Sequence, residues 1–132
     1  MPKRFYILVL AGLTALAIPS NIQAQAKTSA TNGKQMYDSY CASCHGKDGK
    51  GYGPAASALS KRPTNLTTLA KTHGGKYPAA EVANVLKSGV HGSQDMPTWG
   101  PVFGSMNKAN PTAEETKRIN TLVEFIRVSQ VQ

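Results

Sequence analysis

Several residue types are scarce in this sequence of 132 residues. It contains only two cysteines and one tryptophan, and 7 acidic residues stand against 15 lysines and arginines. The length suits one small domain and excludes two. The formal net charge of +8 favours an acidic partner. Because the basic residues are scattered and no basic run is interleaved with aromatic residues, we expect no nucleic-acid partner.

Long apolar runs are also lacking. The longest, Phe5–Ile18, is shorter than the ~20 residues that a membrane span needs, so we expect no stable membrane insertion. Lys3 and Arg4 precede this run, and small residues at Ala24 and Ala26 follow it, which is the pattern of a cleaved export signal. An uncleaved anchor is the alternative. We predict a signal peptide at 1–26, with cleavage after Ala24 or Ala26, a flexible leader at 27–32 and one folded domain at 33–132.

The rest of the chain has helical rather than strand periodicity. No stretch alternates apolar and polar residues over several positions, whereas Thr112 and Glu115 form a capping-box pattern before an apolar stripe. The sequence therefore predicts an all-α fold. Glycine- and proline-rich loops of the predicted length are unusual in a compact domain unless a non-protein group organises them. We predict main helices over 32–45, 78–88 and 113–129, short helical turns over 55–60 and 66–72, and loops over 46–54 and 90–111.

The two cysteines lie in the segment Cys41-Ala42-Ser43-Cys44-His45. Thiols one helical turn apart can bond to the two vinyl groups on one edge of a haem, and the next residue then presents an imidazole to the iron. This C-x-x-C-H spacing is the attachment signal for c-type haem. It occurs once, so we predict one covalently attached haem c, with His45 as an axial ligand.

Two other uses of the cysteines are less consistent with the sequence. A thioredoxin-like redox pair would need a strand-to-helix turn in a βαβ unit, and no strand is predicted. A zinc site would need two further ligands, and neither His73 nor His91 pairs with the cysteines at a zinc-finger spacing.

The chain resembles class I cytochromes c, the small mono-haem bacterial carriers. The resemblance implies three main helices, short helical turns and long loops wrapped around one haem, so that 33–132 would be a cytochrome c domain. It implies that Gly33 and Tyr37 of the first helix cross the last helix near Phe125. The matching segments are Cys41–His45, Gly49–Pro54, Pro63–Thr67, His91–Gly100 and Leu122–Ile126.

Met96 is the predicted sixth ligand of the iron. A thioether opposite an imidazole is the arrangement of an electron carrier. Pro97 biases Met96 toward an extended conformation and prevents a helix there. The resemblance agrees, since a Met-Pro pair supplies the axial sulfur in the family. The alternatives are Met106 or His91 as the ligand; Met36 is better explained as a core residue.

Other residues are candidates for framing the haem. The resemblance implies that Pro54 packs on the histidine side and that its region helps to orient the ligand ring. Trp99 has an indole N–H that needs a partner if buried, either a haem propionate or none if the ring merely packs in the core. Arg62 or Lys61 could pair with a propionate or remain solvated.

These features predict a soluble, monomeric periplasmic carrier that passes single electrons and is not an enzyme. Two ligands on the iron leave no position for a substrate, and Lys47, Lys50 and Lys61 would orient a redox partner with an acidic face. The alternatives are a haem peroxidase or gas-binding protein with a labile sixth ligand, and an electron-transfer subunit of a larger oxidoreductase.

Overall fold

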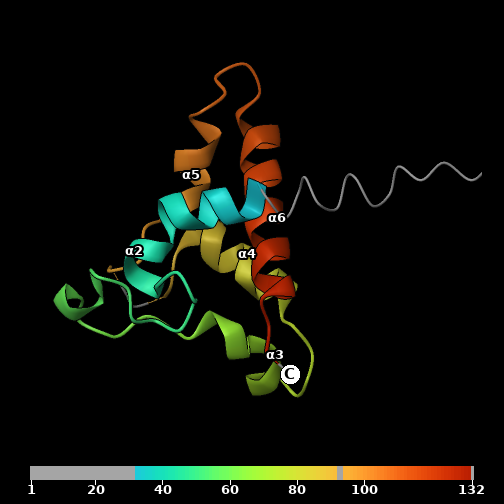
Figure 1. Cartoon of the computed structure of the whole chain (residues 1–132). Coiled ribbons are helices and arrows are strands. Elements are labelled where there is room, and N and C mark those ends of the chain that lie inside the picture. Colours follow the sequence, from blue (N-terminus) through green and yellow to red (C-terminus); the bar gives the residue numbers. More distant parts are fainter. Residues whose placement is uncertain (1–31, 92–93, 132) are drawn as a thin grey trace, which may run out of the picture.

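The computed structural model describes residues 32–91 and 94–131, and within them every regular element is helical (Figure 1). The all-α prediction is therefore confirmed for this part of the chain. The predicted signal peptide and residues 27–31 lie outside the described residues, whereas Asn32 already belongs to the first helix. The elements are a helix over 32–40, α2 (Ala42–His45), the 3₁₀ turns η1 (Ala56–Ala58) and η2 (Leu66–Thr68), α3 (Leu69–Thr72), α4 (Ala79–Ser88), α5 (Trp99–Gly104) and α6 (Pro111–Val128).

The core forms where α4, α5 and α6 pack together. Phe103 of α5 and Leu122 of α6 are fully buried, and Leu86 of α4 is nearly so. Figure 1 shows α5 and α6 side by side, joined by the loop at one end of the molecule. Across the described residues, no helix combines the length and the apolar character that crossing a membrane requires.

The first helix, over 32–40, runs across α6 (Figure 1). A Cβ atom on Gly33 would lie 2.8 Å from the Cβ atom of Phe125, so only glycine permits this approach. One helical turn later, the rings of Tyr37 and Phe125 pack with centroids 5.2 Å apart. The predicted crossing of the first and last helices at these three residues is therefore present in the structure.

Helix α5 replaces part of the loop that the sequence predicted over 90–111. Pro101 lies in its first turn, where a missing N–H does no harm. A Cβ atom on Gly100 would lie 2.7 Å from the carbonyl oxygen of Lys87, so this glycine serves close packing against α4 rather than a loop. Glycine and proline predicted a loop here, but Gly100 is needed for the packing of α5 against α4 and Pro101 fits the first turn of the helix.

Helix α6 begins two residues earlier than its sequence pattern indicates. The side chain of Asn110 caps it by accepting a hydrogen bond from the Ala113 N–H at 3.2 Å. The predicted capping box at Thr112 and Glu115 is therefore wrong. Glu115 instead pairs with Lys87 at 3.3 Å, which joins α6 to α4.

The end of α6 is tied to η2 and α3. The Gln130 side chain accepts from the Ala70 N–H at 2.9 Å and donates to the Leu66 carbonyl oxygen at 2.6 Å. The Val131 N–H donates to the Thr67 carbonyl oxygen at 2.8 Å. These three hydrogen bonds hold η2 and the start of α3 against the residues that follow α6.

Candidate functional site

The C-x-x-C-H segment follows the first helix directly in the chain and is hydrogen-bonded to its last turn. The Cys41 N–H donates to the Tyr37 carbonyl oxygen at 2.8 Å, and the His45 N–H donates to the Cys41 carbonyl oxygen at 2.9 Å. Cys41 itself forms a turn, with φ −116°, so the helix predicted over 32–45 is divided there. The two cysteines remain one helical turn apart, as attachment to a haem edge requires.

Cys41 and Cys44 are not joined in a disulfide. Cys41 is buried and Cys44 is half-buried. Burial, together with the neighbouring Cys44 thiol, raises the pKa of Cys41 to about 12. Every regular element of the described residues is helical, so the strand-to-helix turn of a thioredoxin-like pair is not found among them. Among residues 32–91 and 94–131, no three His, Cys, Asp or Glu side chains come together as a metal site.

The ring of His45 is oriented by the backbone of another segment. Its Nδ1 lies 3.0 Å from the carbonyl oxygen of Thr64. A carbonyl oxygen can only accept, so Nδ1 carries the proton and the lone pair of Nε2 is left available. Burial lowers the pKa of His45, with the Thr64 bond acting in the opposite direction. The neutral imidazole that a metal requires is therefore the favoured form.

The glycine-rich loop after His45 folds back over α2. The Gly51 and Gly53 N–H groups donate to the carbonyl oxygens of His45 and Cys44, at 2.7 and 3.0 Å. The buried Tyr37 hydroxyl donates to the Gly46 carbonyl oxygen at 2.8 Å. The loop thus satisfies the last carbonyl groups of α2 and holds the segment that carries the histidine.

Met96 lies between α4 and α5, half-buried and packed against the core. The loop after η1 is tied to the same segment. The Ser60 N–H donates to Asp95 Oδ2 at 3.1 Å, and the Ser60 hydroxyl donates to the same oxygen. These bonds join residues that no sequence pattern brings together.

The other residues predicted to frame the haem are Trp99, Pro54 and Arg62. Trp99 packs in an aromatic cluster with Tyr40 and Phe103, at centroid distances of 5.5 Å to each. Pro54 is exposed, and a haem contact by either Trp99 or Pro54 stays a prediction. Arg62 lies over the ring of Tyr52, 4.6 Å from its centroid, and donates to the Tyr52 hydroxyl at 2.9 Å.

The model of one protein family matches residues 28–114, and its description reads "Cytochrome C oxidase, cbb3-type, subunit III". The chain belongs to this family. It therefore contains a class I c-type cytochrome domain that binds haem c covalently, and it is an electron carrier rather than an enzyme. No curated protein and no solved structure matches it.

The residues of this cytochrome c domain fit the haem that the family implies. Cys41 and Cys44 offer two thiols, each of which can add its S–H across one vinyl group to form a thioether. His45 offers a neutral imidazole whose Nε2 is unprotonated. The carbonyl oxygen of Thr64, which orients that ring, escaped the sequence analysis because a backbone atom carries no signal in residue type.

Proposed function

We propose that this protein is an exported, periplasmic one-electron carrier in which Cys41 and Cys44 attach the haem and His45 and Met96 are its axial ligands. The observation that supports this most strongly is the bond between His45 Nδ1 and the Thr64 carbonyl oxygen, which leaves the lone pair of Nε2 available to bind a metal. A bound haem supplies the Fe(III)/Fe(II) couple.

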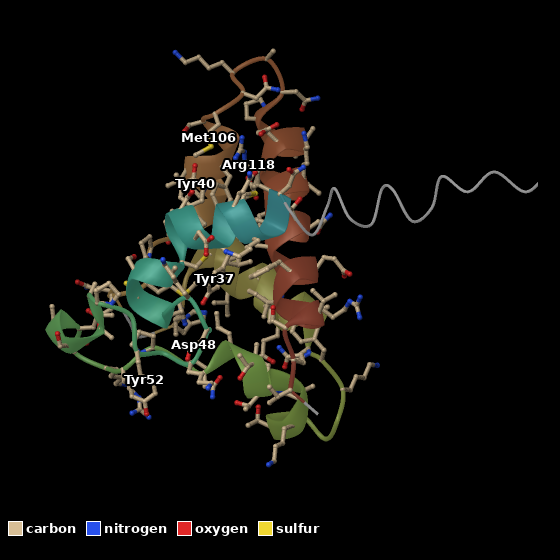
Figure 2. All side chains as sticks on the ribbon, viewed as in Figure 1. Tyr37, Tyr40, Asp48, Tyr52, Met106 and Arg118 are labelled. Atoms are coloured by element: carbon tan, nitrogen blue, oxygen red, sulfur yellow. The ribbon has the colours of Figure 1, made fainter. Side chains whose placement is uncertain are left out.

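The position of the other methionines supports Met96 as the sulfur ligand. In the view of Figure 2, Met106 lies well above Asp48, which follows His45 closely in the chain. Met106 is also 42% exposed. Met36 lines a groove between the first helix and α6. Met96 alone among these three precedes a proline.

The surface near the attachment segment favours an acidic partner. Lys47, Lys50 and Lys61 are exposed, and the first two lie in the loop that folds over α2. Positive side chains there would orient a partner toward the haem without forming a tight complex. An electron would then pass between the two proteins, and no substrate would need to reach the iron.

A second candidate is supported by the family description, which names a subunit of an oxidase. The same domain would then transfer electrons as a bound subunit. Gel filtration of a native extract separates the two: a haem-stained species of about the size of one chain supports the free carrier, and a much larger one supports the subunit.

The ligand assignment is tested with Met96→Ala, with Met106→Ala as its matched control. We expect ferric Met96→Ala to lose the weak absorption band at the red edge of the spectrum, to have a lower reduction potential and to bind carbon monoxide when reduced. Met106→Ala should match the wild type. A Met96→Ala protein that keeps the band would contradict the assignment, and rapid carbon monoxide binding by the wild type would favour a gas-binding protein or peroxidase.

Export and attachment are tested by mass spectrometry of the protein purified from a periplasmic fraction. We expect one added haem and an N-terminus after Ala24 or Ala26. A chain with an intact N-terminus in the membrane fraction would instead support an uncleaved anchor.

A further inference from the structure

We propose that Ser60 and Asp95 form a clasp that positions Met96, so that the thioether stays on the iron. This inference rests on the proposed role of Met96 as sixth ligand. The clasp consists of two hydrogen bonds to one carboxylate oxygen, from the Ser60 N–H at 3.1 Å and from the Ser60 hydroxyl. It joins residues 35 positions apart in the chain.

Ser60, the first partner in the clasp, lies on a segment that is tied to the segment carrying His45. Ser60 follows η1, and the chain that leads into η1 is bonded to the attachment segment: the Gly53 N–H donates to the Cys44 carbonyl oxygen at 3.0 Å, and the Ala55 N–H donates to the Ser43 carbonyl oxygen at 2.9 Å. Ser60 is therefore held relative to the segment that carries His45.

The other side of the clasp belongs to the methionine loop, residues 94–97. Thr98, the residue after this loop, lies beside the end of α4, because a Cβ atom on Gly89 would lie 3.1 Å from Thr98 Oγ1. Asp95 and Met96 lie within this loop. The clasp thus holds the methionine loop at a second place, directly beside the predicted ligand.

Fixing the position of this loop should keep the Met96 thioether on the iron for longer. When a metal ligand is positioned by hydrogen-bonded neighbours, it spends less time away from the metal. Ser60 bonds through both its backbone and its side chain, and the acceptor is a carboxylate, which strengthens both bonds. The clasp therefore joins the segment bonded to the His45 region to the loop that carries Met96, and it does so outside the helical core.

The test measures how fast imidazole binds to the ferric, haem-loaded protein, because imidazole can enter only after Met96 leaves the iron. Ser60→Ala removes the hydroxyl bond and keeps the N–H bond, so we expect binding about two- to tenfold faster. Asp95→Ala removes both Ser60 bonds together with the bond from the Lys61 backbone N–H, and it should have a larger effect. Ser105→Ala is the control, because the exposed Ser105 also donates one side-chain bond, to the Val102 carbonyl oxygen, but outside the methionine loop.

The outcomes distinguish the clasp from the ligand assignment. Faster binding in the order Asp95→Ala, Ser60→Ala and then wild type, with Ser105→Ala unchanged, supports the clasp. If the wild type has the red-edge band and all four proteins bind imidazole at one rate, the clasp is wrong and Met96 remains the ligand. If the wild type lacks the band, the ligand assignment fails first. Equal acceleration by Ser60→Ala and Ser105→Ala would also overturn the clasp.

Discussion

At the scale of single residues, the loop over α2 depends on Gly51 for two separate reasons. Gly51 and Gly75, a glycine that follows α3, both have a positive φ, at 84° and 87°, where other residues are strained. Around Gly75 a side chain would meet nothing within 4 Å, whereas a Cβ atom on Gly51 would collide with the carbonyl group of Pro63. Gly51 is therefore required for both its conformation and its close contact.

The pair Gly51→Ala and Gly75→Ala separates these two reasons. We expect Gly75→Ala to lower the free energy of unfolding by roughly 1–2 kcal/mol through backbone strain alone. Gly51→Ala should cost a further ~1–3 kcal/mol, because the Pro63 segment must move. Guanidinium unfolding of the haem-loaded variants, followed by circular dichroism, measures the difference. Equal losses would show that the loop adapts to the extra methyl group.

At the scale of elements, α6 is defined by what caps it and by what it packs against. In its predicted apolar stripe of Ile119, Leu122, Val123 and Ile126, Val123 is half-buried and the other three residues are buried. Its first turn is set by Asn110, outside the stripe. Capping is therefore a feature that can be tested separately from the core.

Asn110→Ala and Thr112→Ala test which residue caps α6. We expect Asn110→Ala to lower the free energy of unfolding by about 1 kcal/mol, because the Ala113 N–H loses its acceptor. Thr112→Ala should stay within about 0.5 kcal/mol of the wild type. Asn110→Asp should restore most of the loss. A larger loss for Thr112→Ala would revive the capping box.

Tyr77 links the chain before α4 to α6, since its hydroxyl donates to the Val123 carbonyl oxygen at 3.0 Å. Burial, with a smaller contribution from Glu124, raises the pKa of Tyr77 to about 12 from its ordinary value of 10.0. Between these two values the unfolded chain binds fewer protons than the folded one. The stability that Tyr77 contributes is therefore complete below pH 10 and is lost as the pH rises through about 12.

Tyr77→Phe should be less stable than the wild type at neutral pH, because it lacks the bond to Val123, but should lose less stability between pH 10 and 12. Urea unfolding at a series of pH values measures both effects. Tyr52→Phe is the control, since Tyr52 is 67% exposed. A Tyr77→Phe profile parallel to that of the wild type across this range would contradict the pKa assignment.

At the scale of the whole molecule, charge and topology act together. The sequence has 15 basic and 7 acidic residues. The fold places some of the basic ones, such as Lys47 and Lys50, on the loop around the attachment segment. Small charged redox reagents should therefore sense a positive potential near the haem.

The rate of electron transfer should depend on salt in opposite ways for reagents of opposite charge. We expect oxidation by anionic ferricyanide to slow by roughly tenfold between low and high ionic strength. Oxidation by a cationic cobalt complex should accelerate instead. Stopped-flow kinetics measures both, and Lys47→Glu with Lys50→Glu should flatten both dependences. Identical salt dependence for the two reagents would exclude a positive docking surface.

Short-range chemistry accounts for what the sequence determined by itself. The spacing of Cys41, Cys44 and His45 and the periodicity of α4 and α6 are local patterns that survive in any helical arrangement, whereas the crossing at Gly33 was implied only by the resemblance. The family match agrees with the resemblance that these patterns indicated.

Only the tertiary structure decided the rest. Helix α5 lies in a region rich in Gly and Pro, Asn110 rather than Thr112 caps α6, and the Thr64 carbonyl oxygen meets His45 from 19 positions away. The bonds of Ser60 to Asp95 are equally remote in sequence. Backbone acceptors and long-range polar pairs have no periodicity or residue signature, because they exist only once packing of the helices has brought distant segments together.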